Sequence, residues 1–189
     1  MQGRKIGRWP FFGAALKSRL EKIADRLRDP GAPIPNAIVA HYALHRSRKR
    51  FRRFKALLEL RRRGVVIVTD RYPQAEVAGV HDGPILAGVA KSAGVARTQY
   101  EERRLYEIMA SHVPTLIIRL HVELETAMAR KPDHVRSLIA RKIDTLPQIN
   151  FNGARMIDLD ATDDYVSELE LAKAAVDKAL DSVYPASRR

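Results

Sequence analysis

The chain has 189 residues, about the length of one domain, and combines a formal net charge of +12 with no cysteine. The lack of cysteine excludes disulfides, zinc–thiolate sites and thiol catalysis, and a hydrophobic fraction of 46% argues against intrinsic disorder. The excess of basic residues implies an anionic partner: a phosphorylated ligand, nucleic acid or an acidic surface.

The first third of the chain predicts two helices. Apolar residues at helical spacing predict an amphipathic helix over 11–28, which the Asp-Pro-Gly sequence at 29–31 ends. A second helix is predicted over 36–63, with Asn36 as its N-cap and Gly64 as its C-terminal stop. The basic start of the chain lacks a small-residue cleavage site, and no stretch is apolar enough to span a bilayer. We therefore expect a cytoplasmic protein without membrane association.

The β-branched, apolar run Val65–Thr69 is typical of a parallel strand that is covered on both faces. Residues 73–96 are rich in proline and glycine and predict a long loop. Thr98 and Glu101 form a capping-box pattern for the next helix, and Asp133 is placed to cap a later one. The remaining predicted elements are a helix over 99–112, a strand over 116–120, helices over 123–130 and 133–143, a strand over 156–159 and a helix over 164–183.

Strands that alternate with helices predict an α/β fold, in which a parallel sheet carries helices on both faces. We interpret the chain as a single domain over 1–189. Its expected parts are a helical lead-in over 1–35, a core over 36–184 and a tail over 185–189.

The positive charge is concentrated in one predicted helix. Residues 41–63 contain ten lysines and arginines and a single acid, Glu59, so this stretch supplies +9 of the net charge. Phosphate binding and nucleic-acid contact are the functional interpretations, and a solvated outer face is the structural one. We expect only one or two of these cations to face a ligand site.

Asp70 and Arg71 follow directly on the first predicted strand. Ligands of open parallel sheets bind beyond the carboxyl ends of the strands. A carboxylate there suits Mg²⁺ or its waters, and the arginine fork suits phosphate oxygens. The alternative is an ordinary ion pair at the strand end.

A second cationic group lies on a predicted helix–break–helix element. Such an element closes over a phosphate chain in some enzymes, and the alternative is a solvated helical hairpin. Its members are Arg130, Lys131, Arg136, Arg141 and Lys142.

The order of motifs from about residue 37 to 184 resembles the thymidylate kinases and the wider nucleoside monophosphate kinases. The resemblance is closest to the thymidylate-kinase-like proteins found with polysaccharide biosynthesis genes. The motifs that carry it are Asp70-Arg71-Tyr72, Asp82-Gly83-Pro84, Tyr100-Glu101-Glu102, Pro114 to Leu120, Arg130-Lys131-Pro132-Asp133 and Ile157 to Thr162.

The resemblance implies a three-layer fold of the P-loop NTPase type, with a five-stranded parallel sheet. It implies transfer of the γ-phosphoryl group of ATP, with Mg²⁺, to a nucleoside monophosphate or a related phosphate acceptor. Asp70 would belong to the magnesium and acceptor-phosphate region, and Arg71 and Tyr72 to the acceptor site. The other implied residues are Arg130, Arg136, Arg141 and Lys142 in or near the lid, Asp160, Ala161 and Thr162 at the adenine, and Arg46, Arg48 or Lys49 at the acceptor phosphate.

The 189 residues contain no G-x-x-x-x-G-K-[ST] phosphate loop, which in this family follows the first strand. We expect an incomplete kinase, through truncation, a misplaced start codon or genuine loss, and no phosphoryl transfer in an ADP-release assay. The missing strand would leave unpaired strand edges, which favour a homodimer or a larger oligomer. The alternative function is a non-catalytic module that binds nucleic acid or an acidic partner through helix 36–63.

Overall fold

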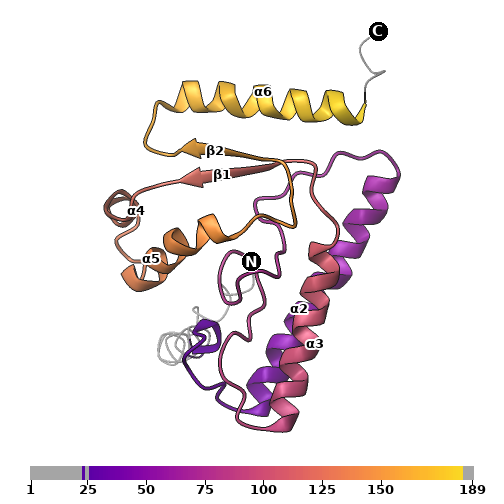
Figure 1. The fold of residues 1–189 in the computed structure, drawn as a ribbon, viewed down its shortest axis with the longest axis vertical. Helices are drawn as coiled ribbons and strands as arrows, with labels where there is room; N and C mark the ends of the chain where they lie inside the picture. The colour runs from indigo at the N-terminus through magenta and orange to yellow at the C-terminus, as the bar shows by residue number, and fades with distance from the viewer. Residues whose placement is uncertain (1–22, 24–25, 185–189) are drawn as a thin grey trace, which may run out of the picture. The chain divides into compact units, whose positions relative to one another are not determined.

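The computed structural model describes residues 23 and 26–184, and the chain divides into two compact units, Met1–Met109 and Ala110–Arg189 (Figure 1). Together they form a mixed α/β structure. Most of the predicted helix over 11–28 and the tail over 185–189 lie outside the described residues, although residues 23 and 26–28 are helical. No helix in the described part of the chain is long and apolar enough to cross a membrane.

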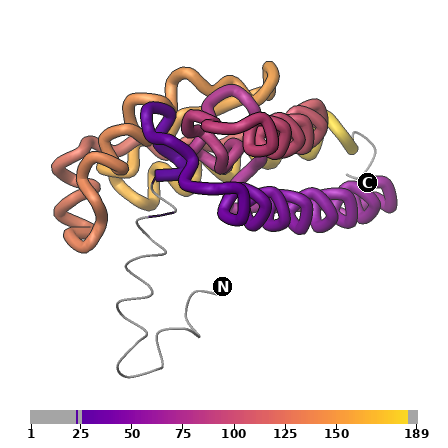
Figure 2. The backbone as a smooth tube through the Cα atoms, turned by 90° about the horizontal axis from the view of Figure 1, so that it is seen from below, coloured from indigo at the N-terminus to yellow at the C-terminus, as the bar shows by residue number. Residues whose placement is uncertain are grey.

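The basic segment forms helix α2, Ala37–Arg62, which can be followed along its length in Figure 2. The side chain of Asn36 accepts a hydrogen bond from the backbone N–H of Val39 at 2.9 Å, as expected of an N-cap. Gly64 has a φ of +83°, a left-handed conformation that glycine adopts without a steric cost, so the helix ends there. Both predicted ends of this helix are confirmed.

Helix α3, Ala93–Ala110, begins before the predicted start at residue 99. The predicted capping box at Thr98 and Glu101 is wrong, because Thr98 lies inside the helix and its Oγ1 donates to the carbonyl of Gly94 at 2.9 Å. Ser92 Oγ instead accepts from the N–H of Val95 at the helix start, at 3.4 Å. The glycine-rich loop is therefore shorter than predicted and ends at residue 92.

Two apolar clusters stabilise the first unit. The first joins α2 to α3 through Phe54, Tyr106 and Met109, and Tyr72 contacts Phe54 edge to face at a centroid distance of 5.8 Å. The members of the second are Leu27, Ile34, Ala40, Ala43, Leu86 and Val95. These clusters fix α2 against α3 and fix the long loop beside them.

The strand predicted over Val65–Thr69 is wrong. The segment makes no ladder with any described strand, and Val65, Val66 and Val68 are 45%, 54% and 90% exposed. A β-branched apolar run suits a strand only where neighbouring strands and covering helices remove it from water. Among the described residues, no neighbouring strand pairs with this run, so its apolar side chains stay exposed and it forms no strand.

The second unit holds a parallel sheet, as predicted, but among the described residues the sheet has two strands and not the five that the family resemblance implies. Strand β1, Ile117–His121, pairs with β2, Met156–Asp160, in a register that sets Arg119 opposite Asp158 and His121 opposite Asp160. Its helices are α4 (Leu124–Arg130), α5 (Arg136–Thr145), the short 3₁₀ helix η2 (Leu146–Gln148) and α6 (Tyr165–Val183).

Of two helix starts predicted in this unit, one is confirmed and the other is wrong. Helix α6 begins where predicted, and the side chain of Asp164 caps it by accepting from the N–H of Ser167 at 3.0 Å. Asp133 does not cap α5, which begins at Arg136 with Val135 at the N-cap position. The backbone turns first, with the N–H of His134 donating to the carbonyl of Lys131 at 3.1 Å, so Asp133 falls too early to cap the helix.

Candidate functional site

A buried polar network in the first unit joins α2, α3 and the long loop. Glu102 on α3 is fully buried. Its carboxylate accepts from Ser47 Oγ of α2 at 2.5 Å and from the backbone N–H of Leu86 at 2.7 Å. Burial raises the pKa of Glu102, although both hydrogen bonds favour the charged form. Glu102 thus fastens three separate parts of the chain at one point.

Arg50 extends this network toward the surface. Its Nη1 donates to the hydroxyl of the fully buried Tyr106 at 3.2 Å, and its Nη2 donates to Asp82 Oδ1 at 2.5 Å. The Asp82 side chain is only 10% exposed, and Arg71 Nε lies 3.6 Å from its other oxygen. Two guanidinium groups from distant parts of the sequence therefore meet at one carboxylate, which we call the Asp82 arginine pair.

A tightly built turn positions Asp82. His81 and Asp82 have positive φ values of 45° and 57°, which non-glycine residues rarely adopt. A Cβ at Gly83 would lie 2.2 Å from the carbonyl oxygen of Val77, so only glycine fits there. The buried side chain of Gln74 closes the turn, since its Nε2 donates to the carbonyls of Val77 and Val80 at 2.6 and 3.0 Å.

Of the predicted acceptor-site residues, only Arg71 joins the arginine pair. Asp70 is exposed, and Tyr72 packs half-buried on Phe54, where burial raises its pKa. Arg46 and Lys49 are exposed, and Arg48 forms an ion pair with Glu101 at 2.8 Å. The structure thus brings none of these three α2 cations to Arg71, but brings Arg50.

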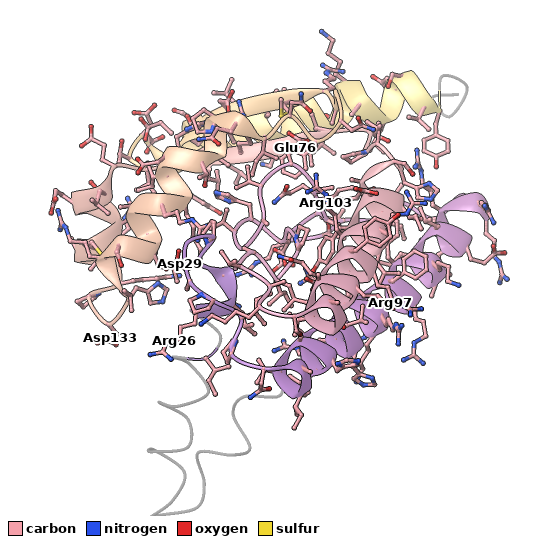
Figure 3. All side chains as sticks on the ribbon, turned by 60° about the horizontal axis from the view of Figure 1, so that its bottom comes forward. Arg26, Asp29, Glu76, Arg97, Arg103 and Asp133 are labelled. Atoms are coloured by element: carbon pink, nitrogen blue, oxygen red, sulfur yellow. The ribbon has the colours of Figure 1, made fainter. Side chains whose placement is uncertain are left out.

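A cavity of about 340 Å³ opens beside α3, on a different face of the helix from the one that carries Glu102 and Tyr106. Gln99 lines it and is held by hydrogen bonds from its Nε2 to the carbonyls of Leu86 and Gly88, at 2.7 and 2.8 Å. Glu76 and Arg103, both labelled in Figure 3, also lie on its wall. None of the residues that the sequence singles out for a site lines this cavity.

In the second unit, charged side chains gather along the paired strands, with Arg119 and Asp158 at the middle of β1 and β2 and His121 at the end of β1. Arg119 binds Asp158 with two parallel hydrogen bonds of 2.6 and 2.8 Å, and His121 Nε2 lies 2.6 Å from the same carboxylate. The hydrogen bonds from Arg119, and then that from His121, lower the pKa of Asp158 to about 2. Asp158 is therefore ionised wherever the protein is folded near neutral pH.

At the end of β2, a predicted lid residue contacts the predicted adenine turn. Arg130 Nη2 donates to the carbonyl of Ala161 at 2.8 Å. Within the turn, Asp160 Oδ1 accepts from the hydroxyl and the backbone N–H of Thr162 at 2.7 and 2.8 Å, and these bonds lower the Asp160 pKa. Arg136, also a predicted lid residue, instead ion-pairs with Glu125 and links α5 to α4. The other two, Arg141 and Lys142, are partly buried on α5.

Comparison with known proteins identifies relatives over nearly the whole chain. The chain is 36% identical over 177 residues to "Uncharacterized ATP-binding protein YghR" of Escherichia coli K12, a match that covers 92% of this chain and 70% of YghR. YghR of E. coli O6:H1 matches equally. "Uncharacterized ATP-binding protein YghS" of E. coli K12 is 35% identical over 182 residues, 93% of this chain and 77% of YghS.

This chain belongs to the YghR and YghS family. No family model matches it. No solved structure matches it either.

Sequence reasoning overlooked two central residues of this YghR-family chain, Arg50 and the buried Glu102 as a fastening point. Arg50 was one of ten similar cations in the basic segment. Its helical phase carries the missing signal, because it follows the buried Ser47 by three residues and precedes the buried Phe54 by four. Glu102 stood out only as part of a family motif.

Replacing Asp158 with asparagine is expected to reduce the loss of stability in acid. The folded pKa of about 2 lies below the ordinary value of 3.8, so ionised Asp158 contributes stability above pH 3.8 that disappears as the pH falls toward 2. Because its side chain is 48% exposed, we expect less than about 1 kcal/mol at neutral pH. Urea unfolding at neutral and acidic pH measures this, with Asp177→Asn on α6 as the control. The same pH dependence in Asp158→Asn and in the unmodified chain would contradict this assignment.

Proposed function

We propose that this chain is a nucleotide-binding protein of the thymidylate-kinase-like type, with ATP as one ligand and a phosphorylated acceptor as the other. One geometric observation carries the proposal: Arg50 and Arg71 converge on Asp82. The relatives' names, which describe ATP-binding proteins, support the nucleotide. The parallel strand pair with its helical crossover is compatible with a P-loop NTPase fold.

The Asp82 arginine pair has the chemistry of an acceptor-phosphate site. Phosphate oxygens accept paired hydrogen bonds from guanidinium groups in the same manner as a carboxylate. Arg50 is held by Tyr106 and Asp82, so little side-chain entropy remains to be lost on binding. Arg71, whose side chain is 69% exposed, keeps much of its surface accessible to a ligand. We therefore assign acceptor-phosphate binding to Arg71, with Arg50 beside it.

Asp70 is the proposed magnesium residue. Within the described residues no group of three or more acidic, histidine or cysteine side chains is placed to hold a metal ion. A single exposed carboxylate fits an Mg²⁺ ion whose other ligands are nucleotide phosphates and water, which is the usual arrangement for this ion. When bound, Mg²⁺ would neutralise charge on the phosphates, and Asp70 would orient it through a carboxylate oxygen.

In the second unit, the turn over Asp160–Thr162 is the proposed adenine contact, with Arg130 beside it. Hydrogen bonds within the turn and from Arg130 hold its backbone in one conformation. A turn fixed in this way presents backbone groups to a planar base without further ordering. The proposed lid residues are Arg136, Arg141 and Lys142, which lie on α5, the helix after Arg130.

The function is tested by titrating a panel of nucleoside monophosphates into the 189-residue chain by calorimetry. Arg71→Ala should weaken binding about tenfold or more, because a hydrogen bond to a charged group contributes roughly 1.5–3 kcal/mol. Arg52→Ala removes the same charge from an exposed position on α2 and should leave binding unchanged. Equal losses in both variants would show nonspecific charge attraction and refute the site.

A further inference from the structure

Helix α2 presents a row of cations to solvent. Arg46, Lys49, Arg52 and Arg53 are all exposed, and their spacing of three or four residues places them on one side of the helix. This side lies opposite the buried Ala43, Ser47 and Phe54. We call these four residues the cationic stripe.

The cationic stripe differs in its pairing from three of the other five cations of α2. Arg48, Arg50 and Arg62 each form an ion pair, with Glu101, Asp82 and Glu59 respectively. The remaining two, Lys55 and Arg61, form no ion pair within the described residues, and Lys55 lies over the ring of Phe51. No member of the cationic stripe has an ion pair within the described part of the chain. Glu59 is the single acid in the sequence of α2. Like charges side by side on a helix destabilise it, so the stripe has a cost that an anionic partner would offset.

We propose that the cationic stripe binds the phosphodiester backbone of double-stranded nucleic acid, independently of base sequence. From Arg46 to Arg53 the helix rises roughly 10 Å, and roughly six duplex phosphate charges occupy that length. Three of the four residues are arginines, whose planar fork matches phosphate oxygens. The binding energy would come mainly from released counterions.

Other anionic partners fit the stripe less well. Single-stranded nucleic acid is usually bound by stacking on aromatic rings, and the stripe contains none. An amphipathic helix binds a membrane by inserting its apolar face, but α2 buries Leu44 and Phe54 within the protein. A duplex needs only a rigid row of positive charges, which α2 provides.

The test measures the affinity of a labelled, mixed-sequence duplex DNA for the 189-residue chain over a range of salt concentrations. If the four cations each neutralise one phosphate, log K should fall against log[salt] with a slope of about −3.6. The double variant Arg52→Gln/Arg53→Gln should weaken binding about tenfold or more and reduce the slope by about 1.8. Circular dichroism confirms that the variants fold.

The matched control is Arg103→Gln/Arg104→Gln on α3. It removes the same charge from two adjacent arginines, but both of these ion-pair with Glu107. This control and Arg71→Ala should leave duplex binding intact, and Arg52→Gln/Arg53→Gln should leave nucleoside monophosphate binding intact. The two sites can therefore fail separately. Equal losses in the two double variants, a shallow salt slope, or binding to phosphatidylserine vesicles but not to duplex would overturn the proposal.

Discussion

Replacing Arg50 with alanine is expected to weaken nucleoside monophosphate binding at least tenfold and to destabilise the first unit. The change leaves Asp82, whose side chain is 10% exposed, with the more distant Arg71 at 3.6 Å, and it removes the donor to the Tyr106 hydroxyl. Leaving such groups unpaired costs about 1–3 kcal/mol. The partial exposure of Arg50 keeps this below the cost of breaking a fully buried ion pair. Calorimetric titration and urea unfolding measure the two effects.

Two further variants separate charge from geometry. Arg50→Lys keeps the positive charge beside Asp82 but loses the fork that reaches Tyr106 as well, so an intermediate loss is expected in both measurements. Arg104→Ala removes an exposed arginine of α3 and should change neither. Unaltered nucleotide affinity in a folded Arg50→Ala protein would exclude Arg50 from the phosphate site.

Replacing Glu102 with alanine is expected to lower the free energy of unfolding by roughly 3–5 kcal/mol in total. This loss is larger than the loss expected for Arg50→Ala. Alanine leaves the Ser47 hydroxyl and the Leu86 N–H without their acceptor in a fully buried position and creates a cavity among α2, α3 and the loop. The control is Glu101→Ala, which removes the neighbouring, more exposed glutamate that pairs with Arg48. Urea denaturation compares the two, and equal losses would contradict the fastening role of Glu102.

The variant Glu102→Gln tests the protonation of the same group. Burial raises the folded pKa of Glu102 above the ordinary 4.5, so its stabilising contribution is complete below pH 4.5 and is lost as the pH rises through the folded pKa. The unmodified chain should therefore lose stability relative to Glu102→Gln as the pH rises from weakly acidic toward neutral. Urea unfolding at several pH values measures the difference. A difference that does not change with pH would show that the carboxyl group titrates normally.

Local sequence signals predicted the regular elements well where the chain satisfies its own hydrogen bonds or pairs with a described neighbour. Asn36 and Gly64 marked both ends of α2, and the two apolar runs that became β1 and β2 lie within a residue of their predicted bounds. The run Val65–Thr69 failed because a strand also needs a partner, which local residue pattern cannot supply. The start of α3 was missed because Thr98 resembles a cap in sequence but bonds backward to Gly94.

The candidate site was also only partly predictable from local sequence, because its residues come from different parts of the chain. Arg71 was identified because it stands beside Asp70 directly after an apolar run, although that run forms no strand. Arg50 and Asp82 lie 32 residues apart in the sequence, and only the folded loop brings them together. The composition shows how many cations α2 carries, but it does not show which of them points toward the buried side of the helix. That choice depends on the phase of the helix relative to its buried face.

We propose that Arg50 and Arg71 together recognise a nucleotide phosphate. This recognition is tested most directly by nuclear magnetic resonance, which follows the arginine side-chain Nε–H signals of ¹⁵N-labelled protein during titration with a nucleoside monophosphate. The variants Arg50→Lys and Arg71→Lys provide the assignments of the two signals. We predict that the Arg50 and Arg71 signals shift together and saturate at one ligand concentration, while those of Arg52 and Arg53 stay in place. Shifts spread over the exposed arginines of α2, or no saturable shift of Arg50 and Arg71, would contradict the claim.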